Sequence, residues 1–412
     1  MKYIITPAVW LLAAVGIAAC GNSKPAARIT SAASAVQLKV LSNRADLLSG
    51  GDAYVEVLLP ANVQADALKV NVDGRDVTAA FAKRGNGRVL GLVTGLKLGD
   101  NVLTATLPDA TGARITLSNH PIGGPVFAGP QVQPWLCDTE ANGLGIAQDA
   151  QCNAPAVLSY LYRSSLTGQF SAYDPASPAS DVAMTTTTEG KTVPFIVRRE
   201  RGTMDRGIYD IVVLFDPATD QEPAPWLPPS AWNGRVMVPF GGGTAPKHMQ
   251  TLPTNTLDVH ALAKGFMVAA NGLHVHGNNT NDNVSAEALM MLKERVIEGY
   301  GLITHTIGEG CSGGGLQQYM LASMYPGLLD GILPTCSFAD VWTTAMDVLD
   351  CSTLLNYYNS TSPLLWAAVP QRGLVDGHSN PSVCLAWELT FASRFDPGSA
   401  AGCSLPAEQV YN

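Results

Sequence analysis

The sequence has little charge, and most of that charge is acidic. Charged residues make up 14% of the 412 residues, with 25 Lys and Arg against 34 Asp and Glu and a net charge of −9. Lys and Arg form no basic run of the kind that binds phosphates, which argues against nucleic acid as a partner. Because 46% of the residues are hydrophobic, the composition also argues against a disordered chain and predicts a large folded core.

The apolar stretch at the start of the chain, residues 4–19, is too short to span a membrane as a helix and has the length of a signal peptide. It ends in Ile17-Ala18-Ala19-Cys20, which resembles a bacterial lipobox and implies acylation of Cys20 after cleavage. The alternative is an ordinary signal peptide with an incidental cysteine. We expect a leader over residues 1–20, a tether over 21–35, and a lipid anchor at Cys20. Gly21, the residue after this cysteine, is not the aspartate that would imply retention in the inner membrane. We therefore expect the protein at the outer membrane or cell surface of a bacterium.

The sequence contains few cysteines, and their positions suggest disulfides. Of eight cysteines, seven remain after Cys20 is set aside, and an exported chain meets an oxidising compartment where disulfides persist. Sequence does not determine connectivity, so the expectation rests on nearness along the chain. The expected local pairs are Cys137–Cys152, Cys336–Cys351 and Cys384–Cys403.

Residues 36–118 have the pattern of an all-β unit. Short alternating stretches recur at the spacing of a β-sandwich, and Asp73-Gly74 is a strong hairpin signal. We expect six or seven strands in an immunoglobulin-like module that acts as a spacer or docking surface. A Pro/Gly-rich connection follows and marks the boundary.

Residues 125–412 alternate between apolar strands and helices, which predicts an α/β fold with a mostly parallel sheet and helices on both faces. A helix over 285–297 is expected to have Ser285 as its N-cap, and the charged stretch 198–202 is expected to be a solvated turn. Late in the domain, 364–369 is a candidate strand. The other expected strands are 192–198, 209–215, 235–240, 265–270, 302–307 and 331–334.

One motif stands between an apolar strand and a helix: Gly310-Cys311-Ser312-Gly313-Gly314. In that context G-x-S-x-G predicts a nucleophile elbow, with Ser312 at strained backbone angles and small residues on both sides. Two alternatives remain: a dinucleotide site using Gly308-x-Gly310-x-x-Gly313, or a glycine-rich turn with only a structural role.

Acyl transfer also needs donors for an oxyanion. The backbone N–H of Gly313 is one candidate. The strand 235–240 ends in Gly241-Gly242-Gly243, and a glycine-rich loop in this place usually supplies the second donor. We therefore expect Gly242, Gly243 and Gly313 to form the oxyanion hole.

On these residues, the region 232–340 resembles the α/β-hydrolase superfamily. The run from Gly310-Cys311-Ser312 to Tyr325-Pro326-Gly327 resembles its tannase and feruloyl esterase branch, and residues from 126 onward resemble a secreted bacterial family of unknown function. The resemblance implies an esterase-like fold without an established substrate. It also implies that the cysteine before the nucleophile bridges to one beside the catalytic histidine.

The base and the acid are expected after the serine, in the order Ser, Asp or Glu, His. His378 is the only histidine after Ser312, and Asp340 follows the next strand. The expected triad is Ser312, His378 and Asp340. His274-x-His276 could suggest a metal pair, but no third ligand has a recognisable spacing, so we expect neither metal nor cofactor.

The three expected local pairs leave Cys311 without a partner. We expect either an unpaired Cys311 whose partner belongs to a longer parent chain, or a Cys311–Cys384 bridge that draws His378 towards Ser312. The sequence thus predicts an exported serine hydrolase acting on a small-molecule carboxylic ester. The alternatives are a dinucleotide-binding oxidoreductase and a non-catalytic surface binding protein on a degenerate hydrolase fold.

Overall fold

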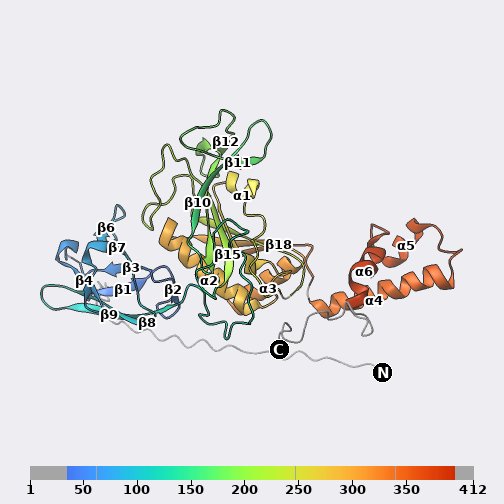
Figure 1. Ribbon diagram of the computed structural model, residues 1–412, viewed down its shortest axis with the longest axis horizontal. Helices are drawn as coiled ribbons and strands as arrows, with labels where there is room; N and C mark the ends of the chain where they lie inside the picture. Colours follow the sequence, from blue (N-terminus) through green and yellow to red (C-terminus); the bar gives the residue numbers. More distant parts are fainter. Residues whose placement is uncertain (1–34, 62, 246, 339, 395–412) are drawn as a thin grey trace, which may run out of the picture.

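The structure is a computed structural model, and it describes residues 35–394 except 62, 246 and 339. The expected leader, the lipobox Cys20, nearly all of the tether, and Cys403 lie outside the described residues. Three parts follow one another along the described chain: a β module, a large sheet with helices on both faces, and a helical lobe (Figure 1). None of the described helices is long and apolar enough to cross a membrane.

The N-terminal module consists of two packed sheets whose apolar faces share one core, which includes Val55, Val70 and Leu103. The alternating burial along its strands explains the period-two pattern of the sequence. An immunoglobulin-like topology stays a prediction. The first sheet has the order β1 (Gln37–Val40), β3 (Ala53–Leu58), β7 (Val89–Val93), β6 (Phe81–Lys83). The second has the order β2 (Leu48–Ser49), β9 (Gly112–His120), β8 (Gly99–Thr106), β4 (Lys69–Val72), β5 (Arg75–Asp76).

The central sheet is mixed, which corrects the expectation of a mostly parallel sheet. Its order is β11 (Phe170–Ala172), β10 (Val157–Arg163), β14 (Ile196–Met204), β15 (Gly207–Leu214), β17 (Met267–Asn271), β16 (Arg235–Phe240), β18 (His305–Cys311), β19 (Gly331–Thr335). The last four strands are parallel, and the first four pair antiparallel. The reason is a direct hairpin: Asp205 and Arg206 both adopt positive φ, at 50° and 62°, which joins β14 to β15 without a crossover.

The expectation of a solvated turn at 198–202 is wrong, because these residues lie within β14. The charge density misled the prediction, since the side chains are paired. Glu200 is only 1% exposed and accepts hydrogen bonds from Arg295 and from the hydroxyls of Tyr209 and Tyr300, at 2.8 to 2.9 Å. A buried carboxylate with this many donors is tolerated inside a sheet.

Helices cover the two faces of the sheet unequally. The long α2 (Asp282–Tyr300) and α3 (Gly313–Met324) pack in one core cluster against β15, β16 and β17, and the short α1 (Val259–Ala263) packs on the other face. The N-cap of α2 is Asn281, whose side chain accepts from the N–H groups of Asn283 and Val284. The expected cap Ser285 is instead buried in the first turn. Asn281 caps equally well by side-chain chemistry.

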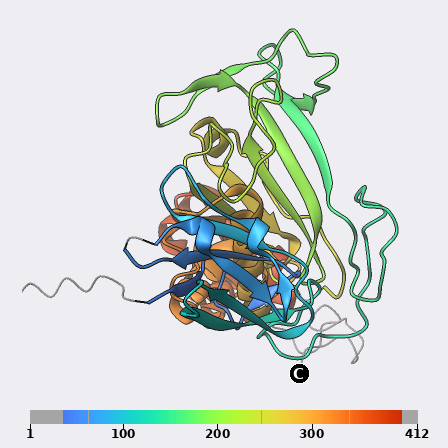
Figure 2. The ribbon, with the colours of Figure 1, turned by 90° about the vertical axis from the view of Figure 1, so that its left-hand side faces the viewer.

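The β module docks on α2, and its contacts are well formed. The carboxylate of Glu294 accepts from the backbone N–H of Ser49 at 2.8 Å and from its hydroxyl at 3.1 Å. Apolar residues of both parts meet beside it: Tyr54, Leu90 and Ile297. Seen from the module side, the strands β10 to β15 extend well past the module (Figure 2).

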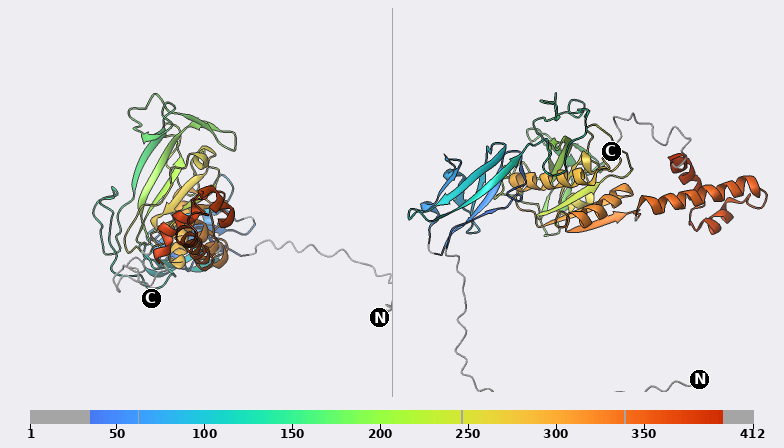
Figure 3. Two further views of the ribbon diagram at one scale, coloured as in Figure 1. Left: turned by 90° about the vertical axis from the view of Figure 1, so that its right-hand side faces the viewer. Right: turned by 90° about the horizontal axis from the view of Figure 1, so that it is seen from below.

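The helical lobe, residues 340–394, follows β19 and contains α4 (Val341–Asn356), a π-helical turn η4 (Tyr357–Thr361), α5 (Val369–Asp376) and α6 (Val383–Phe391). The views from the front and from below agree that it projects away from the sheet (Figures 1 and 3). The expectation of a strand at 364–369 is wrong. This stretch is a turn that leads into α5, where Pro370 occupies the first turn of the helix and favours its start.

Candidate active site

The sharp turn between β18 and α3 is centred on Ser312. β18 ends at Cys311, α3 begins at Gly313, and Ser312 between them has φ 58° and ψ −121°. A non-glycine residue in this region is strained by roughly 1–3 kcal/mol and persists only where its surroundings fix it. Its half-buried side chain makes no hydrogen bond with any described residue. The structure thus has the strand, sharp turn and helix in which the motif was expected.

The neighbours of Ser312 fix this strained turn. A Cβ atom added at Gly310 would lie 2.4 Å from the carbonyl oxygen of Phe240, and one added at Gly314 would lie 2.2 Å from the same atom. Any side chain at either position would collide with the end of β16. The pattern of small residues two before and two after the serine therefore has a single physical cause, which is the close approach of Phe240.

The glycine-rich loop after β16 lies against the elbow. A Cβ at Gly242 would be 3.0 Å from the carbonyl oxygen of Cys311 and 3.6 Å from the Cβ of Ser312. Gly243 has φ 85°, which favours glycine. Within the described part of the chain, the N–H groups of Gly242, Gly243 and Gly313 have no hydrogen-bond acceptor. The structure thus brings Ser312 together with the three glycines expected to stabilise an oxyanion.

A second loop, after β17, packs against the glycine-rich loop that follows β16. It begins with the 3-10 turn η3 (Gly272–His274) and includes His276, whose side chain is only 5% exposed. The Nδ1 atom of His276 lies 2.8 Å from the carbonyl oxygen of Gly243, and a Cβ at Gly313 would lie 2.9 Å from the same Nδ1. Sequence reasoning set His276 aside because it precedes the serine. The sequence feature that could have indicated a role for His276 is its position shortly after β17, the strand that pairs with β16.

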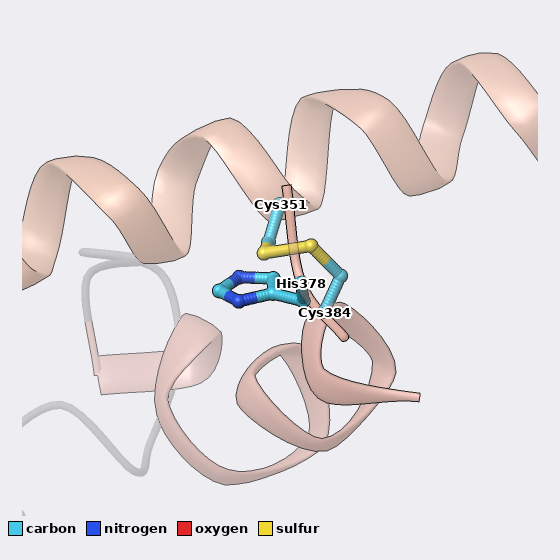
Figure 4. A group of neighbouring side chains, drawn as sticks. All are labelled: Cys351, His378 and Cys384. Carbon is cyan, nitrogen blue, oxygen red and sulfur yellow. A yellow bond between two sulfur atoms is a disulfide. The ribbon is translucent and has the colours of Figure 1, made fainter. Parts of the chain in front are cut away.

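His378 and Asp340 lie elsewhere. Asp340 is the N-cap of α4, where it accepts from the N–H and the hydroxyl of Thr343 at 2.8 and 2.6 Å; these hydrogen bonds lower the pKa of its carboxyl. His378 packs in the lobe against Trp387, with ring centroids 5.5 Å apart. Its ring lies beside the disulfide of Cys351 and Cys384 (Figure 4). Neither side chain forms a hydrogen bond with Ser312 among the described residues, and the lobe projects away from the sheet (Figure 1). No hydrogen bond between described residues joins the three members of the expected triad.

Three disulfides are present in the described chain, of which only Cys137–Cys152 was expected. The others are Cys311–Cys336 and Cys351–Cys384. The expected pairs Cys336–Cys351 and Cys384–Cys403, the free Cys311 and the alternative bridge Cys311–Cys384 are all wrong. The cause is strand register: β18 and β19 are parallel neighbours with Cys311 opposite Thr335, so their ends bring Cys311 beside Cys336.

Two groups of side chains could suggest a metal. Cys351, His378 and Cys384 place their ligand atoms within 4.8 Å of one another, but the disulfide removes both thiolates that a metal would need (Figure 4).

The second group is the pair His274 and His276. His274 is fully buried, and burial lowers its pKa to about 3. Its Nδ1 accepts from the N–H of Asn271, and the Nδ1 of His276 faces the Gly243 carbonyl, so only the two Nε2 atoms could reach an ion. Among the described residues, neither histidine belongs to a group of three possible ligands.

The dinucleotide alternative does not fit the geometry. Gly308 and Gly310 lie inside β18, which continues to Cys311, whereas the fingerprint requires its first glycines in the turn after the strand. A Cβ at Gly308 would be 3.1 Å from the side chain of Gln318, so this glycine serves close packing of helix on strand.

A family model described as a tannase-like family of unknown function (DUF6351) matches residues 38–412. No curated protein matches the chain. Among solved structures, tannin acyl hydrolase from Aspergillus niger is similar at 11% identity and a TM-score of 0.32, over 51% of this chain and 37% of that one. Prolyl oligopeptidase B from Galerina marginata is similar at 11% identity and a TM-score of 0.23, over 86% and 46%. An acetylester hydrolase from Corynebacterium glutamicum is similar at 12% identity and a TM-score of 0.20, over 43% and 50%. The chain thus spans half or less of the length of these three structures.

Proposed function

The chain belongs to this tannase-like family, and from that premise we propose that it is an exported serine hydrolase that cleaves carboxylic esters of small molecules. Ser312 is the nucleophile in this proposal, and the N–H groups of Gly242 or Gly243 and of Gly313 stabilise the oxyanion. The observation that carries the proposal is the convergence of two strand ends on Ser312. These are the strained turn after β18 and the loop after β16, whose Gly242 and Gly243 N–H groups have no acceptor among the described residues.

The chemistry follows from that arrangement. The Ser312 oxygen attacks the ester carbonyl, its proton passes to a base, and the carbonyl oxygen becomes the oxyanion. Collapse of the tetrahedral intermediate breaks the bond to the alcohol, which leaves with that proton, and water then releases the acid from the acyl-enzyme. Preorganised N–H donors and the N-terminal end of α3 favour the negative charge that develops. His378 and Asp340 are not proposed as the base and its partner, because both belong to the lobe.

A burst assay tests this function. With an activated phenolic acetate in excess, an enzyme that forms an acyl-serine releases about one equivalent of phenol rapidly and then turns over more slowly. A burst that disappears on treatment with a serine-directed fluorophosphonate supports the proposal. Linear release at the rate of an unfolded control contradicts it.

The separation of Ser312 from His378 favours a second candidate, a non-catalytic surface binding protein that keeps the hydrolase fold. The same assay separates the two candidates, since a degenerate site forms no acyl-enzyme. The oxidoreductase alternative has lost its support, because the glycines of its fingerprint lie within β18.

We also propose that the protein is anchored to the envelope through acylated Cys20. The support is the lipobox-like sequence before Cys20 and the disulfides, which are typical of exported proteins. The substitution Cys20→Ala should release the protein from membranes or block its maturation. A wild-type protein recovered as a freely soluble chain with an unmodified Cys20 contradicts the anchor.

A further inference from the structure

The loops that follow β16 and β17 are joined side by side beyond the ends of their strands. The N–H of His276 donates to the carbonyl of Gly241 at 2.9 Å, and the N–H of Gly277 donates to that of Gly242 at 3.0 Å. In the other direction, the N–H of Ala245 donates to the carbonyl of His276 at 3.3 Å. The backbone of the candidate oxyanion loop is thus held by the loop that carries His276.

The His276 ring adds the contact that reaches Gly243. Its Nδ1 lies 2.8 Å from the Gly243 carbonyl oxygen, and a carbonyl only accepts hydrogen bonds, so Nδ1 carries the proton. The hydroxyl of Thr244 donates to the same carbonyl at 2.9 Å. Its oxygen also lies 3.2 Å from His276 Nδ1, where it acts as an acceptor if Nδ1 carries the proton. Two donors therefore fix the orientation of this carbonyl, although Gly243 has a backbone conformation that few residues adopt.

The same ring touches the other half of the candidate oxyanion site. A Cβ at Gly313 would lie 2.1 Å from the Gly243 carbonyl oxygen and 2.9 Å from His276 Nδ1. The ring, the Gly243 carbonyl and Gly313 therefore pack against one another with no space for a side chain. The separation between the N–H groups of Gly243 and Gly313 depends on that contact.

We propose that His276 is a positioning residue for this site: its Nδ1–H holds the Gly243 carbonyl and thereby sets the distance between the two N–H groups that receive the oxyanion. The inference rests on the proposed function and adds to it a residue that does not touch the substrate. We propose no base role for His276, because Ser312 makes no hydrogen bond to it among the described residues. The engaged Nδ1 proton leaves only Nε2 for such a role.

Two isosteric substitutions test the role of Nδ1. In His276→Asn the amide nitrogen takes the place of Nδ1, and in His276→Gln it takes the place of Nε2. We expect His276→Gln and His276→Ala to lower kcat about 10- to 100-fold with KM changed less than about threefold, as for loss of one oxyanion contact. We expect His276→Asn to stay within about threefold of wild-type kcat. Equal loss of kcat in the Asn and Gln variants would show that Nδ1 is not the atom on which the site depends, and it would overturn the proposal.

A second readout does not depend on turnover. Nitrogen-15 spectra of histidine-labelled protein should show His276 protonated at Nδ1, and the amide resonances of Gly243 and Gly313 should shift in His276→Gln but not in His276→Asn. A proton on Nε2, or unchanged glycine resonances in the Gln variant, would overturn the inference. A protein without burst kinetics that still shows these shifts loses the proposed function but keeps the positioning contact.

Discussion

The turn around Ser312 and the helical lobe that carries His378 differ in how they are held. The turn follows β18 beside the buried strand β16, and it lies against the backbone of β16 and the His276 side chain of the loop after β17. These contacts leave no room for a Cβ at Gly310 or Gly314. The lobe has a small core of its own, made of Cys351, Leu355, Tyr358 and Cys384 with their neighbours. Large apolar side chains remain exposed on the lobe, including Leu364 at 93% and Leu374 at 86%.

This difference separates two kinds of residue that a motif search treats alike. Ser312, Gly242, Gly243 and Gly313 are placed by strands of one sheet, so their geometry is fixed when the sheet forms. Asp340 and His378 depend on where the lobe lies, and the lobe is joined to the sheet through the short segment after β19. The geometry on which the proposed function rests therefore belongs to the sheet, and the predictions below test whether the lobe takes part.

The largest expected effect comes from Ser312→Ala. Loss of the nucleophile should lower kcat for ester hydrolysis by about 10⁴-fold or more, while the thermal unfolding midpoint changes little. Ser337→Ala is the matched control, since Ser337 packs against Gly315 near the elbow but is not part of it. Steady-state rates for the two variants decide the assignment. If Ser312→Ala retained more than a tenth of the wild-type rate, Ser312 would not be the nucleophile.

The next largest effect is expected from Gly243→Val. A β-branched residue is strained at φ 85° and moves the loop, so kcat should fall about 100-fold with a smaller change in KM. Gly190→Val imposes similar strain at φ 78° in a distant turn where a Cβ meets nothing within 4 Å. The control should lose stability only. Equal kcat in both variants would place the oxyanion site elsewhere.

A smaller effect concerns the stability of the sheet and its docked module. Burial raises the pKa of Glu294 from 4.5 to about 7, and burial also raises the pKa of Glu298 well above its ordinary value. Both carboxyls bind protons more tightly in the folded state, so their stabilisation is full below pH 4.5. The part due to Glu294 is lost as pH rises through about 7. The free energy of unfolding should fall by on the order of 1–3 kcal/mol over this range, and Glu294→Gln should flatten the fall.

The lobe provides the internal control for this pH dependence. None of its described Asp or Glu side chains is buried, so its own unfolding should depend less on pH in the same window. Chemical denaturation at pH 5 and pH 8, followed by tryptophan fluorescence, measures both. If the sheet and its docked β module gained stability as the pH rose, the assignment of raised pKa values to Glu294 and Glu298 would be contradicted.

The smallest effect is expected from substitutions of the two residues in the lobe. His378→Ala and Asp340→Asn should each change kcat by less than about twofold, because neither side chain contacts the elbow. Ester turnover relative to wild type is the measurement. A loss of more than tenfold in either variant would mean that the lobe closes on Ser312 and that the comparison between the two regions is wrong.

The features that sequence predicted well depend on nearby backbone. Ser312 and its flanking glycines, the strand 235–240 and the loop Gly241–Gly243 form a pattern that local sterics dictate. The failures depend on tertiary pairing. Cys311 meets Cys336 through strand register, and β14 includes charges because Glu200 finds Arg295, which follows it by 95 positions. His276 was missed because chain order was used as the criterion for a role near the serine.

The most direct measurement of the central claim is covalent labelling of the wild-type protein and of His378→Ala with a fluorophosphonate, followed by intact mass and peptide mapping. A preorganised elbow in the sheet predicts a single adduct on the peptide that contains Ser312, formed at similar rates in both proteins. No adduct on the wild-type protein, or an adduct on another residue, would contradict the claim that Ser312 is an activated nucleophile.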